Sequence, residues 1–315
     1  MADDLFALAD LLTINDTSFA DLDVTDLEQF APLMQALPYT PATHGTVHKY
    51  TKETGAPVVG FRAANAGRDF DHSEDTAVTA TLQILDFSFQ VDKAVADAYK
   101  RGGAKGWIGR EAARHLRAAF FKYENQLING TITGSGGDTA GFAGFANVLD
   151  DSDDAMVVNA GGSSNVSSVY MIRAGLDDVV GVLGNDGAFD LGDSTVINAL
   201  DGSSMNYPAY YTPGTGYTGL QVGAAKSIGR ICNLTTANGE GLTDDRLFEL
   251  YELFPAGRGP THIVLNKRQH EQLRKSRTAT NATGAPAPMF TEWEGIPLVV
   301  TDAITNTETA LTVAS

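Results

Sequence analysis

The stretch WIGREAARHLRAAFFKYENQLING, residues 107–130, carries the strongest structural signal in this chain of 315 residues. Apolar side chains recur along it at helical spacing, and basic side chains occupy the remaining faces. Asn129-Gly130 follows as a typical helix stop. We therefore predict a long amphipathic helix over 107–128. Its apolar stripe comprises Ala112, Leu116, Ala119, Phe120, Tyr123 and Leu127.

The residues before this helix predict a two-stranded ribbon over 44–90. One strand-like run contains VVGF at 58–61, and VTATLQI at 78–84 alternates apolar and polar side chains. The alternation then changes face, which indicates a bulge or bend near Leu85 and Asp86. Between the runs lies a polar tip, ANAGRDFDHSED at 64–75. Because a lone two-stranded ribbon is marginal in water, it needs a neighbour to lie on.

Residues 1–43 are predicted to form an arm instead of a domain. LFALADLL at 5–12 can make a short amphipathic turn, but Pro32, Pro38 and Pro41 prevent a long helix. The first thirty residues carry eight acidic side chains and no Lys or Arg, whereas 93–122 is rich in both. This asymmetry is typical of solvated faces, and it also permits an acidic arm to lie on a basic element.

The residues after the helix predict mixed secondary structure in an α+β protein. Segment 165–235 alternates strand-like runs with turn signals, and a short helix is expected from Thr243 to Leu253. HIVLN at 262–266 reads as a buried strand that leads into the helix KRQHEQLRK. GIPLVVTDA at 295–303 reads as another strand. The sequence has no internal repeat and no linker that clearly divides two domains.

Composition narrows the class of protein. The chain is 43% hydrophobic, enough for a sizeable core, and its net charge of -17 argues against nucleic-acid binding over the whole surface. The single cysteine, Cys232, excludes an intrachain disulfide. The N-terminus lacks the basic region of a signal peptide, and no apolar run approaches the ~20 residues that cross a bilayer. We expect a soluble cytosolic product that does not enter a membrane.

A search for chemistry finds no assembled site. The glycine-rich stretch 133–145 lacks the Gly-Lys-Ser/Thr of a phosphate loop, and the acidic run 150–154 lacks the Gly and Glu of an EF-hand. The six histidines form no metal-type cluster, and Cys232 has the apolar context of a core thiol. We therefore expect no catalytic, cofactor or metal residues and a structural role.

Several segments, taken in order, resemble the major capsid proteins of tailed bacteriophages with the Hong Kong 97 fold. No single segment is sufficient to identify the family, but the order of the segments along the chain matches the order in the family. They are GFRAANAG at 60–67, SFQVDKAVADAY at 88–99, EAARHLRAAFFKYENQLINGT at 111–131, AGFAGFANVL at 140–149, THIVLNKRQHEQL at 261–273, SRTATNATGAPAP at 276–288 and EWEGIPLVVTDAI at 292–304.

The resemblance implies a head protein of the virion that assembles with itself into pentamers and hexamers in the host bacterial cytoplasm. It further implies a portal protein, packaged double-stranded DNA touched without sequence preference, and possibly a decoration protein. The implied parts are an arm (1–43), an extended loop (44–90), a spine-helix region (91–131), an axial domain in two portions (132–164 and 236–315) and peripheral-domain strands (165–235).

The same resemblance suggests where subunits touch. The hypothesis places Arg68, Phe70 and Asp71 of the ribbon tip in an intersubunit interface. It adds the apolar side chains of the arm and three arginines of the helix, namely Leu5, Leu8, Leu12, Arg110, Arg114 and Arg117.

Three departures from the family pattern matter. Only about 90 residues precede the spine region, which favours a separate scaffolding protein over a cleaved one. The tip 64–75 contains no Lys, so the covalent cross-link of the Hong Kong 97 type is not expected. Little chain follows residue 304, so 165–235 is the expected source of the peripheral strands. An insertion of this segment within the axial domain remains open.

Two other functions stay open on the sequence. An encapsulin-type compartment would share the fold but hold an enzyme cargo. A soluble α+β enzyme would show specific turnover without assembly.

Overall fold

The computed structural model describes residues 30–69, 71–184, 187, 189–237, 239–280, 285 and 287–312. Its helices are α2 (Pro32–Ala36), α3 (Lys93–Asp97), α4 (Gly103–Asn129), α5 (Phe145–Val148), α6 (Asp244–Glu252) and α7 (Lys267–Thr280), with 3-10 turns η1 (Thr133–Ser135) and η3 (Ala225–Ser227). The strands are β1 (Tyr39–Pro41), β2 (Val47–Gly55), β3 (Glu74–Thr81), β4 (Gln83–Asp86), β5 (Phe89–Asp92), β6 (Val157–Asn159), β7 (Ser167–Ile172), β8 (Val179–Leu183), β9 (Phe189–Leu191), β10 (Thr195–Leu200), β11 (Asn206–Thr212), β12 (Gly214–Val222), β13 (Ile228–Leu234), β14 (His262–Leu265), β15 (Glu292–Trp293) and β16 (Ile296–Val300).

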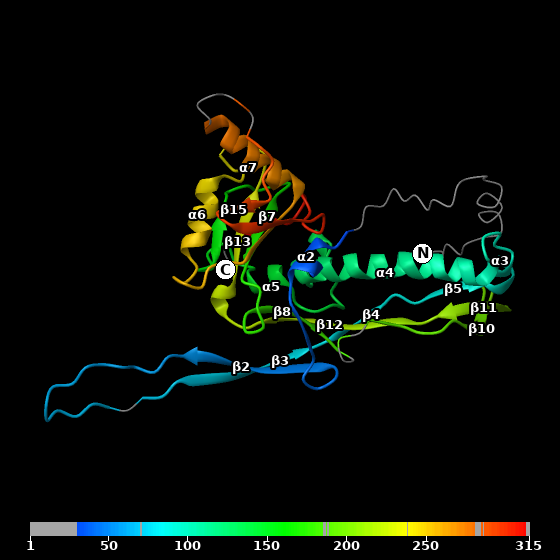
Figure 1. Cartoon of the computed structure of the whole chain (residues 1–315), viewed down its shortest axis with the longest axis horizontal. Coiled ribbons are helices and arrows are strands. Elements are labelled where there is room, and N and C mark those ends of the chain that lie inside the picture. Colours follow the sequence, from blue (N-terminus) through cyan, green and yellow to red (C-terminus); the bar gives the residue numbers. More distant parts are fainter. Residues whose placement is uncertain are drawn as a thin grey trace.

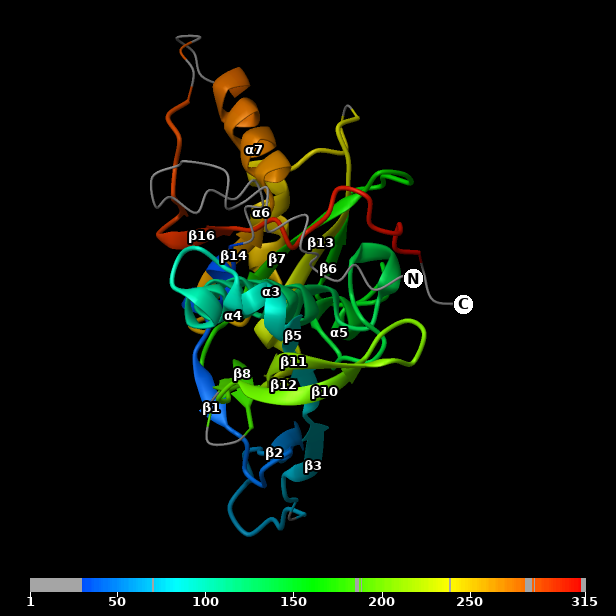
Figure 2. The ribbon, with the colours of Figure 1, turned by 90° about the vertical axis from the view of Figure 1, so that its right-hand side faces the viewer.

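The molecule is elongated and built in successive layers (Figures 1 and 2). The β2–β3 ribbon projects from one end, and a long sheet, antiparallel except for the parallel edge strand β1, runs from its base beneath α4. On the other side of α4 stands a six-stranded sheet of order β15-β16-β14-β7-β13-β6, with α6 and α7 beside it. This arrangement of helices and sheets is the predicted α+β class.

The long sheet is one ladder made of two parts. The pairs Phe89↔Thr212 and Asp86↔Thr215 keep a single register, so β4–β5 runs antiparallel to β11–β12 through a short break. At the break, Phe87 N–H donates to the Gly214 carbonyl at 3.0 Å. The ladder is therefore interrupted at residues 87–88, two residues after the position that the sequence indicated, and its register does not shift as it would at a bulge. A further interruption falls at Leu82, between β3 and β4.

Helix α4 confirms the predicted helix and extends it to residues 103–129. It ends at Gly130, whose φ of 57° lies in the left-handed region that favours glycine. The C-terminal half is buried in the main core, where the Tyr123 hydroxyl donates to the Gly219 carbonyl at 3.2 Å. The N-terminal half packs Trp107 in a separate small cluster with Phe89. The helix thus joins both parts of the long sheet to the core.

The ribbon differs from prediction in its first strand. Residues 58–61 were expected in a strand, but β2 is VHKYTKETG at 47–55, and it pairs with β3 from Val47↔Thr81 to Gly55↔Glu74. Pro57 and Gly60 flank the apolar residues and disfavour a continuous ladder there. The non-strand tip is therefore longer than 64–75 and begins directly after Gly55.

Segment 165–235 was expected to supply one set of strands beside the long helix, and the structure divides it. Strands β8 to β12 lie in the long sheet under α4. Strands β7 and β13, with Tyr170 and Ile228, instead pair with each other at the centre of the six-stranded sheet. Every residue of both strands is buried. Strands of this kind are packed against other elements on both faces. The turn signals in the sequence do not reveal in which of the two sheets such a strand lies.

The elements predicted near the C-terminus are confirmed. Helix α6 follows Thr243, whose hydroxyl accepts the Arg246 N–H at 3.4 Å. Strand β14 is buried and leads directly into α7, and β16 lies parallel to it with Ile263 opposite Leu298. These elements build the six-stranded sheet and its flanking helices.

Candidate assembly surfaces

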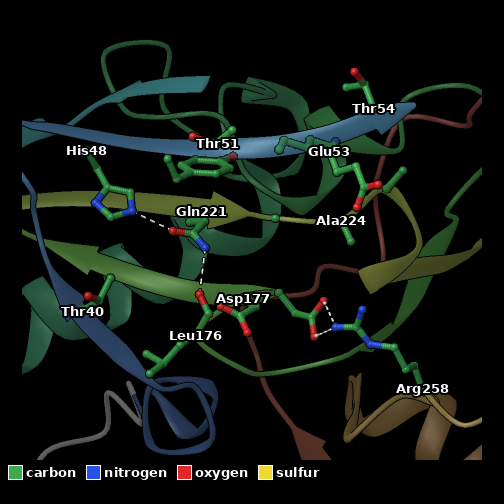
Figure 3. A pocket seen from close by; sticks show the side chains of 15 residues that line it. Thr40, His48, Thr51, Glu53, Thr54, Leu176, Asp177, Gln221, Ala224 and Arg258 are labelled. Carbon is green, nitrogen blue, oxygen red and sulfur yellow. Dashed lines mark hydrogen bonds and ion pairs between the residues drawn. The ribbon is translucent and has the colours of Figure 1, made fainter. Parts of the chain in front are cut away.

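The β2–β3 ribbon is held to the body only near its base. The buried His48 places its Nε2 2.7 Å from Gln221 Oε1, and Gln221 Nε2 donates to the Leu176 carbonyl at 2.9 Å (Figure 3). The Tyr50 hydroxyl donates to the Val222 carbonyl at 3.2 Å. From Thr51 onward most side chains of the ribbon are exposed. The base is therefore an anchor, and the rest of the ribbon extends away from the body.

A groove of about 960 Å³ separates the ribbon from the body at this anchor (Figure 3). Its far wall holds an ion-pair cluster in which Arg173 and the more exposed Arg258 both bind the Asp178 carboxylate. Hydrogen bonds from Arg173 hold the pKa of Asp178 below its usual range. These charges pair with one another, and no lining hydroxyl is hydrogen-bonded to a histidine or carboxylate side chain that could activate it, so the groove offers no catalytic constellation.

The ribbon tip exposes apolar side chains that the sequence reading had placed in a strand. Val58 is 69% exposed, Val59 is 84% exposed and Phe61 is fully exposed. Extended loops that display three large apolar groups in water are typical of contact surfaces. The sequence APVVGF at 56–61 already indicates that these residues are not in a buried strand, because Pro57 and Gly60 stand on either side of the valines.

The predicted tip residues have different environments. The Asp71 carboxylate accepts the Val58 N–H at 2.9 Å, so it shapes the tip. Arg68 is exposed. Phe70 lies outside the described residues, as do Leu5, Leu8 and Leu12 of the arm.

The three arginines of α4 lie far along the molecule from the tip, so the structure does not bring the two groups together. Arg110 lies over the Tyr99 ring, 5.8 Å from its centroid, and Arg114 pairs with Glu111 at 3.2 Å. Arg117 is exposed. Arg110 is thus largely part of the packing, whereas Arg117 presents its charge to the surroundings.

The hairpin β10–β11, at the end of the long sheet opposite the ribbon, carries an apolar surface that the sequence reading did not identify. Val196, Leu200 and Met205 are each more than half exposed. Val196 and Leu200 have the same parity on β10, so they share one face of the strand.

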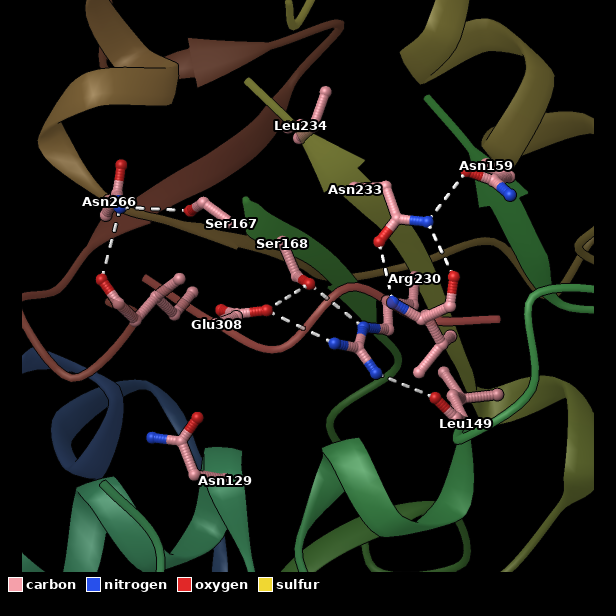
Figure 4. Close-up of polar contacts among 12 residues, drawn as sticks. Asn129, Leu149, Asn159, Ser167, Ser168, Arg230, Asn233, Leu234, Asn266 and Glu308 are labelled. Atoms are coloured by element: carbon pink, nitrogen blue, oxygen red, sulfur yellow. Dashed lines mark hydrogen bonds and ion pairs between the residues drawn. The ribbon is translucent and has the colours of Figure 1, made fainter. Parts of the chain in front are cut away.

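The C-terminal segment is fastened to the six-stranded sheet by a buried polar network (Figure 4). Arg230 on β13 donates to Glu308 at 3.2 Å, to the Ser168 hydroxyl at 3.0 Å and to the Leu149 carbonyl at 2.8 Å. Ser168 in turn donates to Glu308 at 2.6 Å. Nearby, the Asn233 side-chain amide donates through Nδ2 to the Leu311 carbonyl and accepts the Leu311 N–H at Oδ1. These bonds pair the buried charges of Arg230 and Glu308, which would be costly to bury alone, and they leave Glu308 Oε1 without a hydrogen bond.

Within the described residues, His, Cys, Asp and Glu side chains form no group of three that could hold a metal ion. No described helix is both long enough and apolar enough to span a membrane. Cys232 is buried, and burial raises the pKa of its thiol to about 11, which disfavours the thiolate.

Comparisons with known proteins agree with this geometry. The family described as "Major capsid protein GP7" matches residues 21–312. A search of curated proteins found no match.

Two solved structures share the fold over nearly their full length. The first is that of bacteriophage Epsilon15, with a TM-score of 0.74 and 22% identity over 99% of this chain and 98% of that chain. The second is the capsid of bacteriophage JBD30, with a TM-score of 0.50 and 12% identity over 93% of this chain and 97% of that chain. The expected Hong Kong 97-like fold is therefore confirmed. Because the family match spans almost the whole chain, this chain belongs to the GP7 family of major capsid proteins and is a structural subunit of a tailed-phage head, not an enzyme.

Proposed function

We propose that copies of this chain assemble into pentamers and hexamers that close a head around double-stranded DNA, with each ribbon lying across a neighbouring copy. The observation that carries the proposal is the ribbon itself, which extends from its anchor at His48 and exposes Val58, Val59 and Phe61 at its tip. In the terms of the family resemblance, the six-stranded sheet unit corresponds to the axial domain, and α4 with the long sheet corresponds to the peripheral domain.

Energetics favour a partner for the tip. Burying a Val or Phe side chain contributes about 1.5–3 kcal/mol, so three such side chains can stabilise each contact by several kcal/mol. A contact that pairs one surface of a copy with a different surface of the next copy closes into a ring when the rotation fits. Because the same contact is repeated at every subunit of the ring, a small interaction free energy per contact is sufficient for assembly.

The partners beyond a second copy follow from the family and remain proposals. They are a separate scaffolding protein, a portal protein, a possible decoration protein and packaged DNA on the inner face, with assembly in the host cytoplasm. Arg114 and Arg117 are the proposed cationic contacts of α4, toward either the DNA or the acidic arm of residues 1–30.

The experiment replaces Val59 and Phe61 together with Asp. Because both side chains are exposed, the free energy of unfolding of the subunit should change little, while shells and capsomers seen by electron microscopy should be lost. The matched control, Val59→Ile with Phe61→Leu, keeps the tip apolar and should assemble. Normal shells from the double Asp variant would contradict the proposed role of the tip. Particles filled with protein cargo instead of DNA would favour a compartment over a phage head.

A further inference from the structure

Glu124 on α4 is fully buried and joins three separate parts of the chain. Its Oε2 accepts the Leu33 N–H at 2.8 Å and the Met34 N–H at 3.3 Å, at the start of α2. Its Oε1 contacts the hydroxyl of Thr301, directly after β16. All of these partners are neutral, although a buried carboxylate is normally paired with a cation.

The two oxygens of Glu124 differ in what they face. Oε2 meets two N–H donors and can only accept, whereas Oε1 meets a hydroxyl, which can donate or accept. The Thr301 oxygen already accepts the Ala303 N–H at 3.1 Å and has a second lone pair for another donor. A proton on Oε1 can therefore donate to Thr301 while both backbone N–H contacts of Oε2 are kept, and the Thr301 O–H then turns away from Glu124. The site accommodates a neutral carboxyl after rotation of this one hydroxyl.

The groups that face Glu124 do not favour its charge. They are Tyr39 from β1, whose ring packs on Tyr123, and Asp302 after β16, and none of these is a cation. Burial, with a smaller contribution from the charge of Asp302, raises the pKa of Glu124 to about 7, and the hydrogen bonds from Thr301, Met34 and Leu33 only partly oppose this rise. Burial raises the pKa values of both tyrosines, so neither titrates near neutral pH.

We propose that Glu124 is a proton-operated latch that holds residues 30–41 on α4 when its carboxyl is protonated and loosens them when the proton is lost. The segment it controls contains α2 and β1 and connects the arm to the body. Besides Glu124, this segment is held by the buried side chains of Leu33 and Leu37 and by the short pairing of β1 with β8. The contact lies within one chain, so the latch does not depend on the proposed assembly.

The direction of the pH effect follows from the two states. The pKa is about 7 when the segment is closed and near its ordinary value of 4.5 when opening exposes the carboxyl to water. Protons therefore bind the closed state more tightly, and closure weakens as the pH rises from 4.5 through 7. The ratio of closed to open segment should fall by up to about three hundredfold across that range.

Amide hydrogen exchange of the full-length chain tests the latch. We expect the protection factors at residues 33–34, corrected for intrinsic exchange at each pH, to fall between pH 6 and pH 8. In Glu124→Gln, whose amide can accept from both N–H groups and donate to Thr301, protection should stay the same at both values. Glu111→Gln, on the same helix but paired with Arg114, should behave like the wild type.

Equal pH dependence in the wild type and Glu124→Gln, or none in the wild type, would overturn the proposal. Should Glu124→Gln fail to fold, infrared spectroscopy of the double variant Arg230→Met with Glu308→Leu provides the test. This variant removes the second buried Glu among the described residues together with its counter-charge, so a protonated-carboxyl band that titrates near pH 7 must remain. The absence of that band would also overturn the proposal.

Discussion

Arg230 and Glu308 show how single residues hold the end of this chain. Both are buried, and their ion pair is completed by Ser168 and the Leu149 carbonyl, so the bonds reach β7, β13 and the loop before β6. Nothing in the sequence around Glu308 indicated this role, because its partners lie 78 and 140 residues away. The same is true of Glu124, which lies beside an apolar stripe in the sequence and contacts the chain 90 residues before it.

Glu308→Ala should destabilise the subunit strongly, because it leaves the Arg230 guanidinium buried without its counter-charge. We expect a loss of about 3–5 kcal/mol in the free energy of unfolding, measured with denaturant. The double variant Arg230→Met with Glu308→Leu removes both charges and should recover much of this loss. A single variant as stable as the wild type would show that water reaches the site.

The arginines of α4 should separate into two roles. Arg114→Glu with Arg117→Glu should leave the subunit folded, since each exposed ion pair contributes only ~0.2–1 kcal/mol, but should impair assembly or DNA packaging. Arg110→Glu should lower the thermal unfolding temperature, because its side chain packs on Tyr99. Calorimetry of the subunit and the DNA content of particles measure the two effects. Full DNA content in the double variant would refute the proposed contacts.

At the scale of elements, the sequence predicted those whose pattern is local and missed those decided by distant partners. Helix α4 was predictable because its apolar stripe and its terminal glycine lie within one stretch. The first ribbon strand was misplaced, since VHKYTKETG at 47–55 has little apolar alternation and is defined by its pairing with β3. The sequences of β7 and β13 resemble those of the strands beside them in the chain. What distinguishes these two strands is that both of their faces are buried, which depends on distant parts of the chain.

Two glycines of α4 should respond oppositely to alanine. Gly130 has a positive φ, and a Cβ there would collide with the Asn147 side chain and the Gly144 backbone, so Gly130→Ala should cost several kcal/mol or abolish folding. Gly109 lies inside the helix with open space around it, so Gly109→Ala should stabilise by about 0.5–1 kcal/mol. Denaturant unfolding of both variants checks the pair, and similar effects would contradict the account of the helix end.

For the whole molecule, two exposed apolar surfaces lie at opposite ends of the long axis. The ribbon tip occupies one end, and the β10–β11 hairpin occupies the other (Figure 1). A subunit with apolar surfaces at both ends is suited to repeated contacts with copies of itself. Self-assembly, which the family implies, explains why apolar side chains are exposed at both ends of the fold. A protein that acts as a monomer would not require such surfaces.

We expect mature particles to be held without covalent cross-links, because the tip at 64–75 offers no lysine amine to a neighbour and Lys49 and Lys52 lie in β2 near the base. Particles boiled in detergent should run on a denaturing gel as the 33.3 kDa chain. A ladder of multimers would refute the expectation.

The most direct test of the central claim is the assembly state of the purified chain, seen by negative-stain electron microscopy and checked by light scattering. The account predicts pentamers, hexamers or closed shells, which can be irregular in shape when no scaffolding protein is present. A stable monomer at high protein concentration would contradict it.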